Sequence, residues 1–315
     1  MRVLITSFPS YGHVNTMLPL AREARRAGHD VVVATGADLV PEIQRRGFDT
    51  WLVGPSRAES SASAHPGLAA LSPEERAQAP TSGNPFIEAS AKRAVDLVPR
   101  AKEWKPDIVV HEVTELAGAL AAAHTGARHV VHGLSLAMPA RTWEAIFAPG
   151  FARLCEQQDV PELADGIRDA TYLDICPPSL SDGTEPAWRR IQPLRPVAGG
   201  PAAGERLPEA FAALPYPQTI YLTLGTILNE APGVLETAVA GLRELPFNLV
   251  VTTGPGTDPA RLGPQPPHVL AEPYIPHTLL LPRCRLVVSH GGAGIMLGAL
   301  SHGLAQLILP QGLDQ

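Results

Sequence analysis

Cysteine, lysine and aromatic residues are scarce in this chain of 315 residues. Its cysteines, Cys155, Cys176 and Cys284, lie far apart, so they predict neither a disulfide framework nor a zinc site. A net charge of −6 leaves no basic excess, which argues against a nucleic-acid-binding protein. Apolar runs are too short for a signal peptide or for the roughly 20 residues of a membrane-spanning helix. We expect a cytoplasmic protein with reduced cysteines that binds neither nucleic acid nor membrane.

Hydrophobic residues make up 45% of the chain, and in the first part they alternate between strand and helix patterns. The patterns predict strands at 2–7, 30–35, 49–53, 107–111, 128–132 and 171–176. Helices are predicted at 14–27, 39–46, 84–104, 116–125 and, in most of the segment, 138–158. Residues 54–83 predict a surface loop with one short helix after Ser72. Such alternation with short connections is typical of a parallel sheet.

The alternation starts again after residues 193–204, a stretch rich in Pro and Gly that we interpret as a linker. Strands are predicted at 219–223, 248–253, 269–270, 286–289 and 306–309, with helices at 233–242, 278–281 and 293–302. The sequence therefore predicts an α/β fold of two Rossmann-like domains, at residues 1–204 and 205–315.

Candidate functional residues follow the predicted strands, where ligands bind in open α/β folds. The strongest group opens the predicted helix at 293–302, and small residues there would let backbone N–H groups approach a diphosphate. Its alternative is a glycine turn needed only for close packing. The group consists of Ser289, His290, Gly291, Gly292, Ala293 and Gly294.

His13 lies in the turn after the first strand, where a group with a near-neutral pKa suits a general base. The alternative is a histidine at a helix start with no partner. Glu112, one residue past the strand 107–111, could fix the tautomer of a histidine, with His111 and Glu115 as competitors. Its alternative is an exposed acid at a helix start. The first turn lacks GxGxxG, which argues against a dinucleotide dehydrogenase.

Three further groups each have two interpretations. The turn of Thr223, Gly225 and Thr226 could hold a phosphate or only cap a helix. Asp314 and Gln315 could bind sugar hydroxyls or belong to a terminus without fixed structure. An apolar set could line an acceptor cleft or be plain core: Phe86, Met138, Trp143, Phe147 and Phe151.

Taken in order, these motifs resemble the GT-B glycosyltransferases of family 1, and among them actinomycete enzymes that attach deoxysugars to antibiotics and other natural products. The resemblance rests on 12–15, 106–112, 223–226, 274–277, 290–294 and 309–315. It implies two domains facing across a cleft. It also implies inverting, metal-independent transfer from a nucleoside-diphosphate sugar to a hydroxyl of a hydrophobic aglycone. It favours TDP over UDP as the nucleotide without fixing the choice. No cofactor besides that donor is implied.

The resemblance also implies roles for individual residues. His13 matches the catalytic base, and Glu112 stands where many members have the Asp that pairs with it. Asp314 and Gln315 match the sugar-binding pair. The nucleotide would bind at Thr223, Gly225, Thr226, Tyr274, Ile275 and 290–294. Departures from the family pattern are Tyr274 for Trp, His277 for Gln, Ile295 for Thr, and Gly298 where plant members have Glu.

Family members continue beyond the Asp-Gln pair, so we expect the second domain of this chain to be incomplete. The departures at Glu112, His277 and Ile295 keep a non-catalytic auxiliary protein open as an alternative. A sugar-nucleotide epimerase, with the same fold and a different chemistry, is a second alternative. A homodimer or a helper protein is left open as a partner.

Overall fold

The computed structural model describes residues 1–56, 84–181, 183–197, 201, 204–225, 233–254 and 256–311. The described chain forms two compact units, of which the first ends at Pro196 and the second begins at Val197. The short helix expected after Ser72 lies outside the described residues. No described helix is long and apolar enough to cross a membrane.

The first unit is built on a seven-stranded parallel sheet in the order β3-β2-β1-β4-β5-β6-β7. Residues of the central strands are mostly buried, as in β2, which has the sequence DVVVAT. Such strands need cover on both faces. The strands are β1 (Arg2–Thr6), β2 (Asp30–Thr35), β3 (Asp49–Leu52), β4 (Ile108–Glu112), β5 (Arg128–His132), β6 (Thr171–Asp174) and β7 (Arg190–Pro193).

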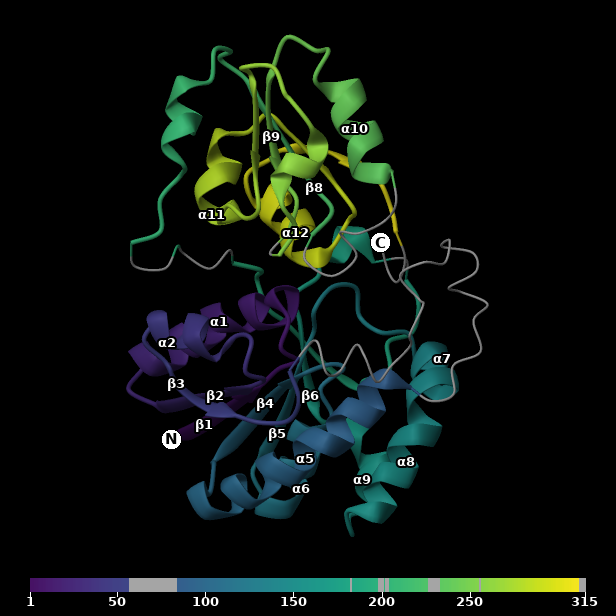
Figure 1. Ribbon diagram of the computed structural model, residues 1–315. Coiled ribbons are helices and arrows are strands. Elements are labelled where there is room, and N and C mark those ends of the chain that lie inside the picture. The colour runs from purple at the N-terminus through teal and green to yellow at the C-terminus, as the bar shows by residue number, and fades with distance from the viewer. Residues whose placement is uncertain are drawn as a thin grey trace. The chain divides into compact units, whose positions relative to one another are not determined.

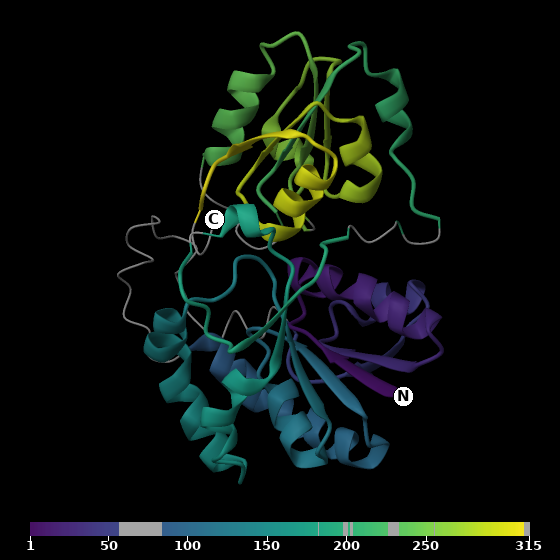
Figure 2. The same cartoon turned by 180° about the vertical axis from the view of Figure 1, so that it is seen from behind.

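Helices cover the two faces of this sheet separately (Figures 1 and 2). Val3 and Ile5 pack with α1 (Tyr11–Arg26) and α2 (Val40–Arg45), whereas Leu4 packs with α5 (Pro85–Trp104) and α6 (Ala117–Thr125). Alternate strand residues point to opposite faces, so side chains near the strand ends also divide between the faces. The further helical segments are α7 (Ala140–Thr142), the π-helical η2 (Trp143–Phe147), α8 (Ala148–Gln157), α9 (Leu163–Gly166), η3 (Ile167–Asp169) and η4 (Pro178–Leu180).

Three predictions for the first unit were wrong in detail. Helix α1 starts at Tyr11 because extended Ser10 is its N-cap, so His13 lies in the first helical turn and not in a loop. Strand β4 includes Glu112, since that residue pairs in register with His132 of β5. The strand at 171–176 is not the last one: exposed β7, which ends at the first residue of the predicted linker, pairs with β6 at the sheet edge, where proline is tolerated.

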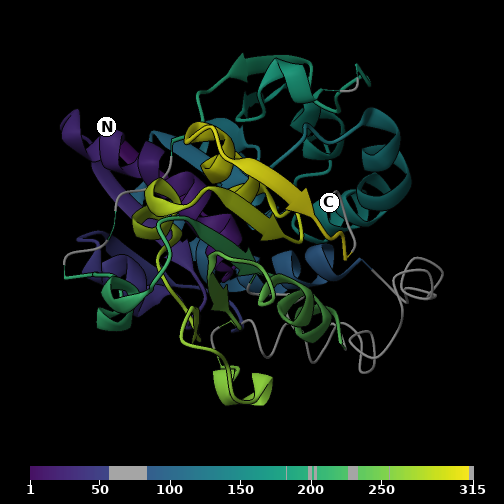
Figure 3. The same ribbon diagram turned by 90° about the horizontal axis from the view of Figure 1, so that it is seen from above.

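The second unit contains a five-stranded parallel sheet in the order β10-β9-β8-β11-β12, with β12 at one edge (Figure 3). The strands are β8 (Thr219–Thr223), β9 (Asn248–Thr252), β10 (Val269–Glu272), β11 (Leu286–Ser289) and β12 (Ala305–Ile308). Helix α10 (Val234–Leu242) packs on one face, and α11 (His277–Leu280) and α12 (Ala293–Ser301) pack on the other. The described part of this unit also contains the 3-10 segments η5 (Glu209–Ala213), η6 (Pro259–Leu262) and η7 (Leu281–Arg283). Both predicted Rossmann-like sheets are therefore present.

Candidate functional site

A buried carboxylate holds His13 at the carboxyl end of the first sheet. The His13 Nδ1 and Glu112 Oε1 atoms lie 3.0 Å apart, and the side chains are 17% and 0% exposed. The pair forms because β1 and β4 are neighbours, and the chain passes from β1 directly into α1. Glu112 lies on the same face of its strand as Val110, which packs on the α1 side. His13 is thus not an unpaired helix-start histidine, and Glu112 is not exposed.

The surroundings of Glu112 favour its ionised form. Burial raises the pKa of this carboxyl, but the charge of protonated His13 and the hydrogen bonds from His13 and Thr114 outweigh it, so the pKa lies below its usual value. Thr114 N–H donates to Oε2 at 2.7 Å, and the Thr114 hydroxyl lies 2.9 Å from both oxygens. The sequence analysis missed Thr114; a threonine two residues after a strand-end acid was its only signal.

The two competitors of Glu112 face the other side of the sheet. Glu115 is 0% exposed and accepts a hydrogen bond from Arg93 at 3.0 Å. Arg93 also donates to the backbone carbonyls of Ser7 and Val53, at the ends of β1 and β3. His111 lies against α6, where a Cβ on Gly118 would come within 2.4 Å of it. The buried Arg93–Glu115 pair, which the sequence analysis also missed, therefore ties strand ends together beneath the site.

Aromatic rings extend from His13 into the first unit. The Phe8 ring lies edge-on to His13, with 6.0 Å between centroids, and edge-on to Phe86 at 5.4 Å. Phe86 in turn stacks on Phe147. Trp143 and Phe147 are buried in the core, at 2% and 5% exposure, as is Phe151, which agrees with the core interpretation. Phe86 and Met138 are only partly buried, so a role in acceptor binding stays a prediction for these two. Phe8 was missed.

The second unit brings its two glycine turns together at neighbouring strand ends. Thr223 of β8 is the register partner of Ser289 of β11. Each hydroxyl oxygen accepts a hydrogen bond from the amide two residues on: Gly225 N to Thr223 at 3.1 Å, and Gly291 N to Ser289 at 3.2 Å. These two amides are therefore already engaged within the protein, unlike the first amides of a helix, which have no intrahelical acceptor.

The His290 ring lies directly against two glycines. A Cβ on Gly225 would come 2.5 Å from His290 Cε1, and one on Gly292 would come 2.4 Å from Nε2. Gly225 also has a φ of +81°, which side chains rarely adopt. The alternative interpretation, close packing, thus accounts for these two glycines. The N-terminus of α12, where Ala293 and Gly294 present the first amides, is compatible with a bound anion.

Other predicted nucleotide residues lie near α11 and α12 or outside the described residues. Ile275 is buried, so only its backbone could meet a base, while Tyr274 is 38% exposed. Thr226, Asp314 and Gln315 fall outside the described residues. Ile295, which replaces a hydroxyl residue of the family, packs in the core beneath α12.

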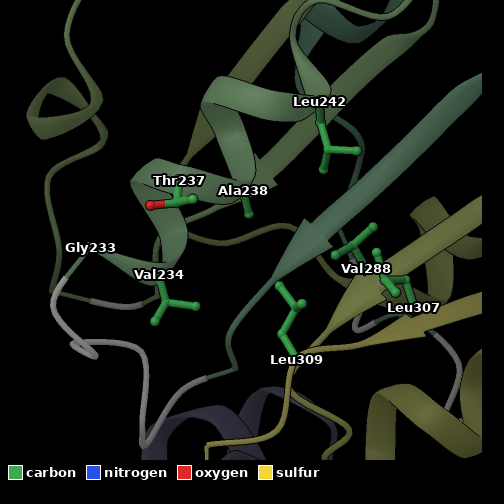
Figure 4. Close-up of a pocket in the computed structure, with 8 residues that line it drawn as sticks. All are labelled: Gly233, Val234, Thr237, Ala238, Leu242, Val288, Leu307 and Leu309. Carbon is green, nitrogen blue, oxygen red and sulfur yellow. The ribbon is translucent and has the colours of Figure 1, made fainter.

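A pocket of about 470 Å³ lies on the opposite face of the second sheet, between α10 and the strands β11 and β12 (Figure 4). Apolar side chains from the helix face those of the strands across it. Of the predicted nucleotide residues that the structure describes, none lines this pocket. Its lining residues are Gly233, Val234, Thr237, Ala238, Leu242, Val288, Leu307 and Leu309.

Solved structures with the same fold include glycosyltransferases from Streptomyces. SnogD from Streptomyces nogalater is 27% identical, with a TM-score of 0.76 over 100% of this chain and 82% of that chain. SsfS6 from Streptomyces sp. SF2575, complexed with thymidine diphosphate, is 25% identical, with a TM-score of 0.75 over 98% and 82%. A curated relative, the L-demethylnoviosyl transferase of Streptomyces niveus, is 32% identical over 100% of this chain and 80% of its own length.

The fold and its relatives define a sugar-transferring enzyme of the GT-B class. Family models described as Erythromycin biosynthesis protein CIII-like match residues 23–188, as the N-terminal domain, and residues 238–315, as the C-terminal domain. The chain belongs to this family of antibiotic glycosyltransferases, as its sequence motifs predict.

Proposed function

We propose that this enzyme transfers a deoxysugar from a TDP-sugar to a hydroxyl of a hydrophobic natural-product aglycone, with inversion and without a metal ion. The observation that carries the proposal is the 3.0 Å pair of His13 with wholly buried Glu112. Such a pair prepares a neutral imidazole to accept a proton and stabilises the imidazolium that results. The deoxysugar and the aglycone class are supported by the relatives' names, such as L-demethylnoviosyl transferase.

The geometry supports one direction of proton transfer. Ionised Glu112 can only accept, so His13 donates from Nδ1 and keeps the lone pair on Nε2. Nε2 takes the proton of the acceptor hydroxyl while the oxygen attacks the anomeric carbon opposite the diphosphate. The C–O bond to the diphosphate breaks, and its electron pair leaves with TDP. An α-linked donor therefore yields a β-glycoside.

The second unit would hold the donor. The amides of Ala293 and Gly294, the His290 ring and Thr226 would stabilise the charge that develops on the diphosphate, without a metal ion. Asp314 and Gln315 would bind the sugar hydroxyls. Thymidine diphosphate is favoured because it is the nucleotide complexed with the relative SsfS6.

The proposal is tested by incubating the chain with a panel of TDP-deoxysugars and a panel of phenolic and aliphatic-alcohol aglycones, with and without EDTA. Mass spectrometry detects the glycoside, and the anomeric proton coupling reports its configuration. His13→Ala is expected to lower kcat by about 10²- to 10⁴-fold, the usual contribution of a general base. His302→Ala removes an exposed histidine and is the matched control.

Three outcomes would contradict the proposal. Near-normal turnover by His13→Ala would remove the base. Loss of activity in EDTA would overturn metal independence. Conversion of a TDP-deoxysugar to a different sugar nucleotide without an acceptor would identify an epimerase.

A further inference from the structure

One buried guanidinium joins the two turns that carry His13 and Glu112. Arg93 of α5 donates from Nε to Glu115 Oε1 at 3.0 Å, in the turn after β4. Its Nη2 donates to the carbonyl oxygen of Ser7 at 2.9 Å, in the turn after β1. His13 follows β1 through that turn, and Glu112 is the last residue of β4. Both members of the pair are therefore linked, through their own turns, to the same side chain.

The second carboxylate oxygen of Glu115 also connects the two strands. It accepts hydrogen bonds from the Thr6 hydroxyl, at the end of β1, and from Gly118 N–H at 3.1 Å. The amide of Glu115 donates to the backbone carbonyl of Glu112 at 2.9 Å. Thr114, which holds the Glu112 carboxylate, lies between the two acids in the chain. A displacement of Glu115 would therefore move the Glu112 carboxylate as well.

The guanidinium also lies beside the ring that contacts His13. Its Cζ atom is 5.9 Å from the centroid of Phe8, the ring that lies edge-on to His13. Nη1 donates to the carbonyl oxygen of Val53 at 3.0 Å, which fixes the plane of the Arg93 fork. A planar fork can serve a carboxylate and several carbonyl oxygens at once, whereas an ammonium is a single point charge.

Stability alone is a weak reason for burying such a pair. The desolvation of two charges offsets much of their attraction, and apolar residues of similar volume often replace a buried ion pair without loss of stability. The Arg93 fork adds direction instead, because each acceptor fixes one N–H bond. Removing both charges together can therefore separate a geometric role from a stabilising one.

We propose that Arg93 and Glu115 are positioning residues, which hold the turns after β1 and β4 at the separation where His13 Nδ1 meets Glu112 Oε1. The catalytic consequence rests on the proposed function, because it takes His13 as the general base. Both positioning side chains are buried and act through the turns that they hold.

The kinetic test uses the double variant Arg93→Met/Glu115→Leu of the full 315-residue chain. We expect it to fold and to lose about 10- to 100-fold in kcat, because a shift of roughly 1 Å in a reacting group has an effect of this size. KM and the Kd of TDP should change by less than about twofold, since the loss falls on the chemical step. Arg46→Met/Glu42→Leu, which removes another largely buried pair of the same unit, is the matched control.

A spectroscopic test needs no substrate. Nitrogen-15 NMR of labelled histidine reports which ring nitrogen of His13 carries the proton, and His13→Gln identifies its signals. The parent chain and the control should show protonated Nδ1, because Glu112 accepts from it. In the double variant, we expect a mixture of the two tautomers, since the carboxylate no longer holds the ring.

Arg93→Lys provides the answer if the double variant does not fold. Lysine keeps a positive charge opposite Glu115, but its ammonium cannot serve the carboxylate and the two carbonyl oxygens with the same geometry. We expect kcat to fall by about tenfold and part of the His13 population to move its proton to Nε2.

A His13 spectrum that is unchanged in the folded double variant, or in Arg93→Lys where that is the variant used, would overturn the inference. An equal loss of kcat in the Arg46→Met/Glu42→Leu control would overturn it too, because any buried pair would then have the same effect. A parent chain that transfers no sugar would refute the proposed function, and the histidine spectrum would still decide whether Arg93 and Glu115 position His13.

Discussion

Replacing Glu112 by glutamine tests whether this carboxylate sets the tautomer of His13. The Thr114 N–H, 2.7 Å from Oε2, can only donate, so a glutamine must place its carbonyl oxygen there. Its NH₂ group then takes the position of Oε1, 3.0 Å from His13 Nδ1. The amide donates to Nδ1, the imidazole proton moves to Nε2, and the base loses the lone pair that would accept the acceptor proton.

The expected cost falls on turnover and not on folding. An enforced wrong tautomer in a comparable histidine–carboxylate pair lowers kcat by about 10⁴-fold, which corresponds to roughly 5 kcal/mol at 1.36 kcal/mol per decade. We expect Glu112→Gln to lose about 10³- to 10⁴-fold in kcat. The Thr114 contacts persist in the variant, so its Tm and its Kd for TDP should stay close to those of the parent chain.

Two assays check this prediction independently. Steady-state kinetics with saturating TDP-sugar and an aglycone from the panel measures kcat. Nitrogen-15 NMR of labelled histidine identifies the protonated ring nitrogen without any substrate: Nδ1 in the parent chain and Nε2 in the variant. Glu42→Gln removes another largely buried carboxylate, which lies on α2 away from His13 and pairs with Arg46, and this variant serves as the control. A variant kcat within tenfold of the parent value, or a proton still on Nδ1, would refute the reasoning.

Three further predictions concern other parts of the molecule. Burial lowers the pKa of His132 to about 4, whereas the unfolded chain takes up this proton near 6.5, so stability should fall as pH drops between these values. Urea unfolding of the parent chain should show a decrease of about 3 kcal/mol in the free energy of unfolding over this pH range, and the His132→Gln variant should lack this decrease. Equal pH dependence of the two proteins would contradict this prediction. Gly225→Ala pushes a Cβ into the His290 ring and should weaken TDP binding at least tenfold by calorimetry, whereas Gly241→Ala on α10, with open space around its Cβ, should not. Phe86→Ala should raise the KM for the aglycone about tenfold without changing the Kd of TDP, and an unchanged KM would exclude this ring from acceptor binding.

Periodicity predicted most strands almost to the residue, because parallel strands buried on both faces must be continuously apolar. The bounds of β2, β5, β8 and β11 agree with their predictions. This reasoning does not detect β7, because all its residues are exposed and its sequence shows no continuous apolar pattern. The strand is defined by its pairing with β6.

The sequence could identify the residues of the candidate site but not which side chains contact one another. His13 and Glu112 could be selected because each follows a strand, and strand ends share one edge of a sheet. The choice of Glu112 over Glu115 could not be made in the same way, since the two acids are only three residues apart in the sequence. The tertiary structure decides it: Glu112 faces α1, whereas Glu115 meets Arg93 from α5 on the other face.

By itself, the sequence determined the two α/β sheets, the family and the positions where polar residues end strands. These depend on local patterns of apolar, glycine and polar residues, which are visible along the chain. Only the tertiary structure decided that Thr114 orients Glu112 and that Phe8 lies against His13. It alone also brings the hydroxyl groups of Tyr221, Thr252 and Thr223 within hydrogen-bond distance. Strand register and the choice of face create these contacts between residues far apart in sequence, and neither leaves a local signal to read.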